Sequence, residues 1–164
     1  MSGRRRPTDS HLEPVNNTPA HHTKPIRIGQ LNTNRRKLVV QTLPNQYVKD
    51  FDILLVPEPS WGQIGGGKMG PVGAAGWTPI LPESVENRPR VMTYVTTGRV
   101  DFTATLRSDI IVSGDIQVLD ICQAGHPTTT VVNVYNDSQL RHATVSRHLS
   151  TLGLPQNAII ISGD

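Results

Sequence analysis

The chain has 164 residues, of which 36% are hydrophobic and 4% aromatic, with a formal net charge of +3 and an isoelectric point near 9.4. This length allows one domain with a core of its own and excludes two comfortable ones. No apolar run approaches the roughly 20 residues that cross a bilayer, and the N-terminus lacks the hydrophobic centre of a secretory signal, so we expect an intracellular protein without membrane association. The single Cys122 excludes an internal disulfide, and we expect a buried, inert thiol.

The first 24 residues are rich in Pro, Thr, Asn, His and Arg and contain almost no large apolar side chain. Such a segment cannot bury enough surface to offset the entropy lost on ordering. We therefore predict a disordered basic arm over residues 1–24 and an ordered domain over residues 25–164. Arg4, Arg5 and Arg6 concentrate positive charge in the arm, which favours a polyanionic partner.

Two strands separated by a helix are predicted at the start of the domain. Apolar and polar residues alternate over residues 26–32, which indicates a strand, and residues 33–48 follow as a helix that its proline kinks or interrupts. Consecutive aliphatic residues over 52–56 indicate a strand buried on both faces. This strand ends at Glu58 between two prolines, at a sheet edge where α/β proteins bind ligands. Alternatively, Glu58 only caps a turn in solvent.

A long, mobile surface loop rich in Gly, Pro and Trp is expected over residues 60–79. Residues 62–69 match the first seven positions of the phosphate-loop pattern G-x-x-x-x-G-K-[ST]. However, Met69 replaces the hydroxyl residue that binds magnesium, and Pro71 follows where a helix is required. These two departures argue against a nucleoside triphosphatase of the phosphate-loop type.

Short strands and one helix are predicted for the rest of the chain. Turn residues separate the strands, and the turn over residues 113–115 reads as a hairpin. Apolar residues at helical spacing predict a helix over residues 138–152, with Gly153 and Pro155 as stop signals. The predicted strands cover residues 77–81, 91–97, 109–112, 116–122, 129–135 and 158–161. Strands that meander after a strand–helix–strand unit indicate a mixed sheet.

Four of the predicted strands end on polar residues. These are Asn32, Glu58, Tyr135 with the adjacent Asn136 and Asp137, and Asp164. An amide, two carboxylates and a phenol supply oxygen ligands for a divalent cation, a base, and a hydrogen-bond donor to a phosphate. The set predicts magnesium-assisted hydrolysis of a phosphodiester. Each residue taken alone also fits a structural role as a cap or a core-edge residue.

Four segments in sequence order carry a resemblance to a known family. The segments Gln-Leu-Asn-Thr-Asn-Arg (30–35), Asp-Ile-Leu-Leu-Val-Pro-Glu-Pro (52–59), Val-Asn-Val-Tyr-Asn (132–136) and Ile-Ile-Ser-Gly-Asp (160–164) resemble the endonuclease/exonuclease/phosphatase superfamily. Within it, they look most like the apurinic-like endonuclease domain of LINE-type, non-LTR retrotransposons. The resemblance implies an α/β (α+β) fold, a four-layered sandwich of the DNase I-like type. The chain would form an incomplete sandwich, roughly its first half to two-thirds.

The resemblance also implies a role for each strand-end residue. Glu58 would be the principal Mg²⁺ ligand, with Asn32 as a second metal contact that orients the site and the phosphate. Tyr135 would donate a hydrogen bond to the scissile phosphate, and Asp164 would position or deprotonate the attacking water. The implied reaction is a DNA nick that supplies a primer for reverse transcription. DNA is therefore the expected partner, the nucleus the expected location, and no obligate protein partner is evident.

Two further residues receive weaker assignments, and several family positions are missing. Asn136 and Arg35 would contact the substrate phosphate or the DNA. The family carries an Asn two places after the acid equivalent to Asp164, and later another Asp and a Ser-Asp-His ending, none of which is present. We expect the chain to lack the second sheet of the sandwich, to leave an apolar face uncovered, and to be poorly active or inactive.

Two alternative functions remain open at this point. A phosphatase of the same superfamily, acting on a small phosphoester, would use a similar set of residues. A non-catalytic nucleic-acid-binding remnant would instead depend on Arg4, Arg5 and Arg6.

Overall fold

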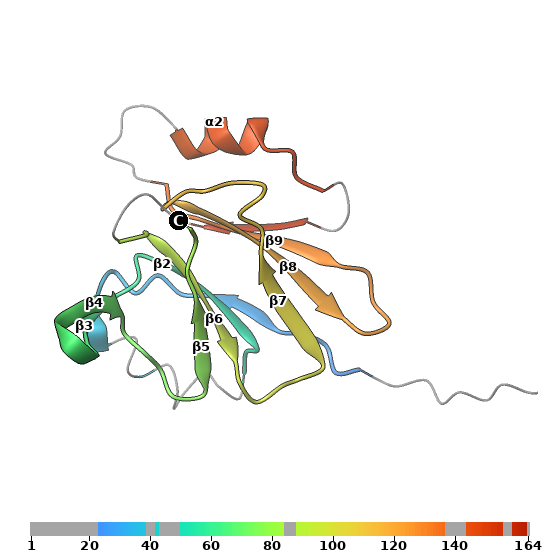
Figure 1. Ribbon diagram of the computed structural model, residues 1–164. Coiled ribbons are helices and arrows are strands. Elements are labelled where there is room, and N and C mark those ends of the chain that lie inside the picture. Colours follow the sequence, from blue (N-terminus) through green and yellow to red (C-terminus); the bar gives the residue numbers. More distant parts are fainter. Residues whose placement is uncertain are drawn as a thin grey trace, which may run out of the picture.

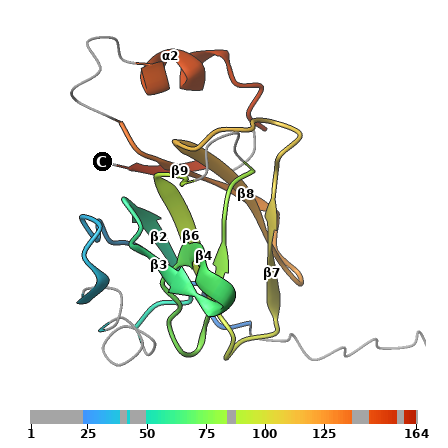
Figure 2. The ribbon, with the colours of Figure 1, turned by 60° about the vertical axis from the view of Figure 1, so that its left-hand side comes forward.

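The computed structural model describes residues 23–38, 42, 50–83, 88–136, 144–155 and 159–163. Two four-stranded sheets pack against each other, and a helix lies over the outer side of the second sheet (Figure 1, Figure 2). The first sheet has the order β1 (Ile28–Gln30), β2 (Ile53–Pro57), β6 (Val91–Thr96) and β5 (Trp77–Ile80). The second has the order β10 (Ile159–Gly163), β9 (Thr129–Val134), β8 (Ile116–Gln123) and β7 (Phe102–Leu106). The expectation that the chain lacks its second sheet is therefore wrong.

Strand β2 lies inside the first sheet, and all five of its residues are buried. Successive side chains point to opposite faces of a strand. Ile53 and Leu55 accordingly pack between the sheets, whereas Leu54 and Val56 join a cluster on the other face. The predicted strand over residues 52–56 is confirmed, including its burial on both faces.

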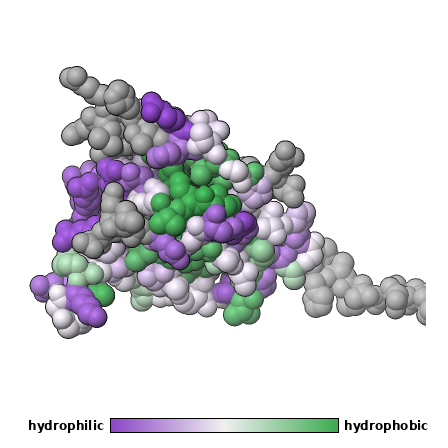
Figure 3. All heavy atoms as spheres, turned by 45° about the horizontal axis from the view of Figure 1, so that its top comes forward, coloured by the Kyte–Doolittle hydropathy of each residue, from purple (hydrophilic) through white to green (hydrophobic). Residues whose placement is uncertain are grey.

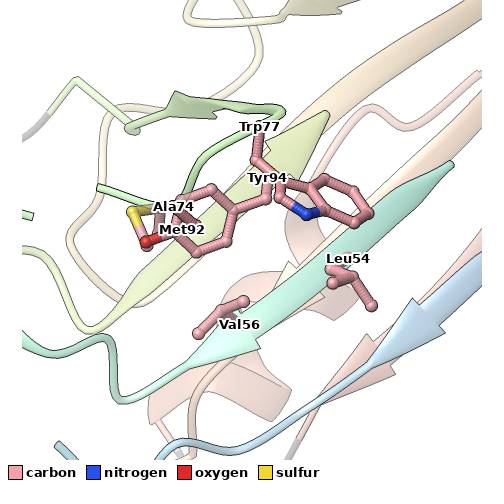
Figure 4. Close-up of a cluster of buried hydrophobic side chains, with 6 residues drawn as sticks. All are labelled: Leu54, Val56, Ala74, Trp77, Met92 and Tyr94. Carbon is pink, nitrogen blue, oxygen red and sulfur yellow. The ribbon is translucent and has the colours of Figure 1, made fainter. Parts of the chain in front are cut away.

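The outer cluster of the first sheet contains an aromatic contact between Trp77 and Tyr94 (Figure 4). The rings of Trp77 and Tyr94 meet edge to face with centroids 6.5 Å apart and planes at 65°. The Tyr94 hydroxyl donates a hydrogen bond to the carbonyl of Val72. Burial raises the pKa of Tyr94 to about 12, so this phenol stays protonated and donates throughout the neutral range.

Buried polar side chains connect the two sheets. The Thr93 hydroxyl donates to Oε1 of Gln117 at 2.7 Å, and Nε2 of Gln117 donates to the Ile80 carbonyl at 2.9 Å. Nδ2 of Asn133 donates to the Met92 carbonyl at 2.9 Å. Directional bonds of this kind oppose sliding between the sheets, because a displaced polar group would stay buried without a partner.

Helix α2 (Thr144–Thr151) covers the outer face of the second sheet. Its Val145 packs in one cluster with the outward-facing valines and isoleucine of β8 and β9. From the side on which α2 lies, a hydrophobic area occupies the middle of the surface and hydrophilic residues border much of it (Figure 3). Ile161 of the edge strand β10 is 54% exposed.

No helix in the described ranges has the length and apolar character needed to cross a membrane.

The strand directions bring several strand ends to one edge. β1 runs parallel to β2, and β9 runs parallel to β10, so the carboxyl ends within each pair coincide. β6 is antiparallel to β2 with Val91 opposite Pro57, which places the start of β6 beside the end of β2. The mixed sheet predicted from the sequence is confirmed.

The predicted mobile loop over residues 60–79 is wrong in its first half. β3 (Trp61–Ile64) and β4 (Lys68–Pro71) form an antiparallel hairpin, joined by the short 3-10 turn η1 (Gly65–Gly67). Gly66 and Gly67 have φ values of 78° and 77°, which glycine adopts without steric cost. Ile64 folds back over the position where Gly70 lacks a side chain. Glycines that suggested mobility thus allow a tight turn and a close contact.

The predicted strand over residues 109–112 and the hairpin turn over residues 113–115 are also wrong. Residues 108–110 form a turn, and Ile110 and Ile111 pack with the outer cluster of the second sheet instead. The strand that precedes β8 along the chain and pairs with it is β7, whose Phe-Thr-Ala-Thr-Leu sequence alternates in polarity but contains mostly small side chains. Cys122, expected to be buried, is exposed because it occupies an outward position at the end of β8.

Other predicted boundaries fall partly outside the described residues. The predicted arm lies outside them except for Thr23 and Lys24, which contact His126, Arg99 and Gln123. The helix predicted over residues 33–48 is described only over 33–38 and at 42. Of the helix predicted over 138–152, residues 144–151 are helical, and residues 138–143 are not described.

Candidate active site

Glu58 follows β2 directly and has a left-handed backbone, with φ of 50°. Hydrogen bonds on both sides of the residue hold this conformation. Its N–H donates to the Arg90 carbonyl at 2.7 Å, and its own carbonyl accepts from the Thr33 hydroxyl at 2.6 Å and the Arg35 N–H at 3.0 Å. Strained backbone that the surroundings hold in place is concentrated at functional sites, so Glu58 is a candidate on conformational grounds.

Three donors surround the Glu58 carboxylate, whose side chain is 15% exposed. Nδ2 of Asn32 donates to Oε2 at 3.4 Å, and the Tyr135 hydroxyl donates to Oε1 at 3.2 Å. Nε of Arg35 lies 3.5 Å from Oε1, on a side chain that is 66% exposed. The ends of β1, β2 and β9 therefore meet at one carboxylate, and the alternative of a Glu58 that only caps a turn in solvent does not describe this geometry.

The turn after β1 fixes Asn32 against the end of β2. The side-chain carbonyl of Asn32 accepts the N–H of Asn34 at 2.7 Å, as in an Asx turn. The buried Thr33 donates its N–H to the Pro57 carbonyl at 3.4 Å. Asn34 and Arg35 both have positive φ values, 49° and 58°. This tight turn explains how Asn32 and Arg35, three residues apart, reach the same carboxylate.

Arg90, which was not identified from the sequence, links Glu58 with Tyr135. Its guanidinium lies 5.1 Å from the centre of the Tyr135 ring, in a cation–π contact. The same guanidinium forms a bidentate ion pair with Asp115, at 2.6 and 2.5 Å, and the Asp115 carbonyl accepts the Tyr135 N–H at 2.8 Å. One residue at the start of β6 thus holds the backbone of Glu58 and the ring of Tyr135.

Of the two remaining predicted site residues, Asn136 is among the described residues and Asp164 is not. Asn136 is exposed and makes no hydrogen bond to any described residue. Asp164 lies outside the described residues, directly after Gly163 at the end of β10. Gly163 is opposite Val134, and a Cβ atom there would collide with the Val134 side chain and carbonyl. The Ser162 hydroxyl donates to the side-chain carbonyl of Gln30, so the end of β10 lies beside the end of β1.

A cavity of about 520 Å³ opens beside Glu58, and we call it the site cavity. Its described lining consists of Arg35, Glu58, Pro59, Trp61, Arg88, Pro89 and Arg90. Three guanidinium groups and one indole thus surround one carboxylate. The sequence analysis missed Trp61, Arg88 and Arg90. The signal available was the Arg-Pro-Arg segment before β6, but its position depends on the antiparallel pairing of β6 with β2.

Comparison with solved structures finds the endonuclease domain of TRAS1, a telomere-specific non-LTR retrotransposon, with a TM-score of 0.64. This chain has the fold of that domain. Sequence identity between the two is 16%, and the match covers 85% of this chain. Comparisons with protein-family models and with curated proteins give no match.

The structural likeness confirms the predicted fold class, an α/β sandwich of the DNase I-like type. The chain spans 58% of the length of the TRAS1 domain. At 16% identity the likeness concerns the fold, so the chemistry of the site has to be argued from its own residues.

The Glu58 carboxylate at the cavity wall fits a divalent cation. Magnesium in enzymes commonly takes one or two carboxylates, water molecules and the substrate phosphate. Glu58 supplies such a carboxylate at the wall of the site cavity, and the guanidinium of Arg35 already lies 3.5 Å from it, as expected where positive charge is favoured. In the described part of the chain, no cluster of three or more His, Cys, Asp or Glu side chains adds to it. Glu58 is the described carboxylate that would hold the ion.

Proposed function

We propose that the chain belongs to a Mg²⁺-dependent nuclease domain that hydrolyses a phosphodiester bond of DNA. The observation that carries the proposal is the convergence of Asn32 and Tyr135 on the Glu58 carboxylate, at the wall of a cavity lined by arginines. Arginines neutralise the phosphates of a nucleic acid, and a carboxylate among them suits a metal ion that bridges protein and phosphate. A DNA nick that supplies a primer, made in the nucleus, is the proposed biological role.

Each residue of the site has its own role in the proposed reaction. A magnesium ion on Glu58 would polarise the phosphate and stabilise the leaving oxygen. Asn32 and Tyr135 orient the site, and the Tyr135 hydroxyl donates a hydrogen bond to a non-bridging phosphate oxygen. Asp164 takes the proton of the attacking water as the water oxygen bonds to phosphorus, and the opposite P–O bond breaks. The Arg35 guanidinium and the Asn136 amide contact the DNA backbone.

A plasmid-nicking assay with Mg²⁺ tests the proposal. We expect relaxed plasmid to accumulate with time in the wild type. Glu58→Gln should abolish nicking, whereas Glu83→Gln, at an exposed glutamate outside the site cavity, should not. Equal nicking by both variants would remove Glu58 from the mechanism.

The alternative functions give different outcomes in the same series. Release of phosphate from small phosphoesters without any plasmid nicking would select a phosphatase. Gel-shift binding that survives Glu58→Gln but collapses when Arg4, Arg5 and Arg6 are neutralised, with no hydrolysis of either substrate, would select a non-catalytic binding remnant.

A further inference from the structure

We infer that the site cavity is a subsite for one unpaired nucleotide of the DNA strand, with Trp61 as the stacking surface for its base and Arg88 as a contact for its phosphate. The inference deepens the proposed function and rests on it, since it specifies which form of DNA the site takes. It follows from three properties of the cavity: its size, its charges and its single indole.

The size and the walls of the cavity suit a small ligand. Its volume of about 520 Å³ falls within the roughly 300–1,000 Å³ that small-molecule sites occupy. Pro59 and Pro89 are both buried and both line it, and their fixed φ angles make this part of the wall stiff. Such a cavity is formed before a ligand arrives, which lowers the entropic cost of binding.

The charges of the cavity lining favour an anionic ligand. One of the lining arginines is available to bind it. Arg90 is engaged with Asp115 and Tyr135, and Arg35 is engaged with Glu58. Arg88 is exposed and forms no ion pair with any described residue. Its guanidinium therefore contributes positive charge that no carboxylate in the described part of the chain neutralises, and a phosphate can bind it without displacing any described carboxylate.

Trp61 identifies the ligand as a base rather than a bare phosphate. The residue begins β3, is partly buried and lines the same cavity as Arg88. Base–aromatic stacking binds single strands independently of sequence, because every base has a π-face. A base inside a duplex is already stacked on its neighbours, so only an unpaired or displaced nucleotide can offer its face to the indole.

The chain allows a direct test by fluorescence, because it has two tryptophans and only Trp61 lines the site cavity. Trp77 is 5% exposed and packs on Tyr94 in the outer cluster of the first sheet. The full chain is titrated with an oligothymidylate of roughly eight nucleotides, in EDTA so that no hydrolysis occurs. We expect quenching of the exposed component of the emission, and weaker quenching by a duplex of equal length.

Substitutions of Trp61 and Arg88 test whether these two residues bind the oligothymidylate. Trp61→Leu should weaken binding of a labelled oligothymidylate roughly 5- to 150-fold, as loss of one stacked base predicts. Arg88→Gln should lower the slope of log K against log salt by about 0.7, the value for one phosphate of a single strand. Arg147→Gln, which removes the same charge from an exposed position on α2, should change the slope less.

Two results would overturn the inference. One is wild-type affinity for the oligothymidylate in both Trp61→Leu and Arg88→Gln, with thermal unfolding of both variants unchanged. The other is quenching by duplex that equals or exceeds quenching by single strand. Glu58→Gln separates this inference from the proposed function: stacking at Trp61 should persist in that variant. Persistent quenching without nicking by the wild type would end the nuclease proposal and leave the nucleotide subsite standing.

Discussion

The Tyr135 hydroxyl at the end of β9 donates a hydrogen bond to the Glu58 carboxylate at the end of β2, at a distance of 3.2 Å. The two residues are 77 positions apart and follow strands of different sheets. Their contact therefore depends on the packing of the whole sandwich, and buried bonds such as that from Asn133 to the Met92 carbonyl hold β9 and β6 in register. A site built between two sheets is sensitive to any change that lets them slide.

Tyr135→Phe should lower the nicking rate roughly 100-fold, because one donor to the developing phosphate charge is lost. The unfolding free energy should fall by less than about 1 kcal/mol, since the lost hydroxyl lies at the partly exposed edge of β9. Rates from single-turnover nicking and urea unfolding curves measure the two effects. Tyr94→Phe is the matched control: it removes a buried hydroxyl far along β6, and it should lower stability by about 1 kcal/mol while leaving the rate unchanged.

Apolar residues separated by turn residues made much of the sandwich predictable. The consecutive aliphatic residues of β2 indicated burial on both faces, and the shorter apolar stretches of β6, β8 and β9 indicated strands. Strand β7 was not predicted, because its Thr-Ala-Thr centre carries little hydrophobic signal. It forms a strand because it pairs with β8. The hairpin of β3 and β4 was not predicted, because its glycines are equally compatible with a tight turn and with a mobile loop.

The meeting of Asn32, Glu58 and Tyr135 could be anticipated, because each follows a strand whose carboxyl end reaches the same edge. The role of Arg90 could not be anticipated, because this residue precedes a strand and does not follow one. Only the antiparallel pairing of β6 with β2, with Val91 opposite Pro57, brings its carbonyl to the Glu58 N–H. Residues that position others through backbone contacts leave no pattern in a single sequence.

The ion pair between Arg90 and Asp115 should contribute measurable coupling. It is bidentate, and both side chains are only 23% exposed. A double-mutant cycle of Arg90→Met and Asp115→Asn should give a coupling free energy of about 1–2 kcal/mol in urea unfolding. The pair of Arg107 with Asp109, whose carboxylate is 64% exposed, is the comparison, and its cycle should give a clearly smaller coupling free energy. Equal coupling in the two cycles would contradict the special role of Arg90.

Arg35→Gln should increase the affinity of the site for divalent cations. Its guanidinium lies 3.5 Å from the Glu58 carboxylate and would have to move or share that carboxylate when a cation binds. At this distance in a solvent-like dielectric, removing the charge is worth about 1 kcal/mol, or roughly a fivefold change in dissociation constant. Calorimetric titration with Mn²⁺ measures it, with the exposed neighbour Arg36→Gln as the charge-matched control. An unchanged or weaker affinity in Arg35→Gln would show that the guanidinium does not compete with the cation.

The opposite end of β2 carries a second carboxylate, Asp52, which serves stability. Its side chain is 4% exposed and accepts hydrogen bonds from the Arg27 N–H at 2.8 Å and from the Arg99 guanidinium at 3.1 Å. Burial by itself raises the pKa of Asp52. The hydrogen bonds from Arg27 and the charges of Arg99 and Arg27 outweigh that effect and hold the pKa below its ordinary value of 3.8.

A carboxylate whose pKa is lower in the folded state stabilises the protein above its unfolded pKa and loses this effect as the pH falls through the folded value. Asp52→Asn should therefore lower the unfolding free energy by about 2–3 kcal/mol at pH 7, since it leaves the Arg99 guanidinium, 12% exposed, without this carboxylate. The difference from the wild type should shrink as the pH falls below about 4. Urea unfolding across this range measures it, with Asp109→Asn, at a carboxylate 64% exposed, as the control that should change little. A difference that stays constant with pH would show that the ionised form of Asp52 does not contribute to stability.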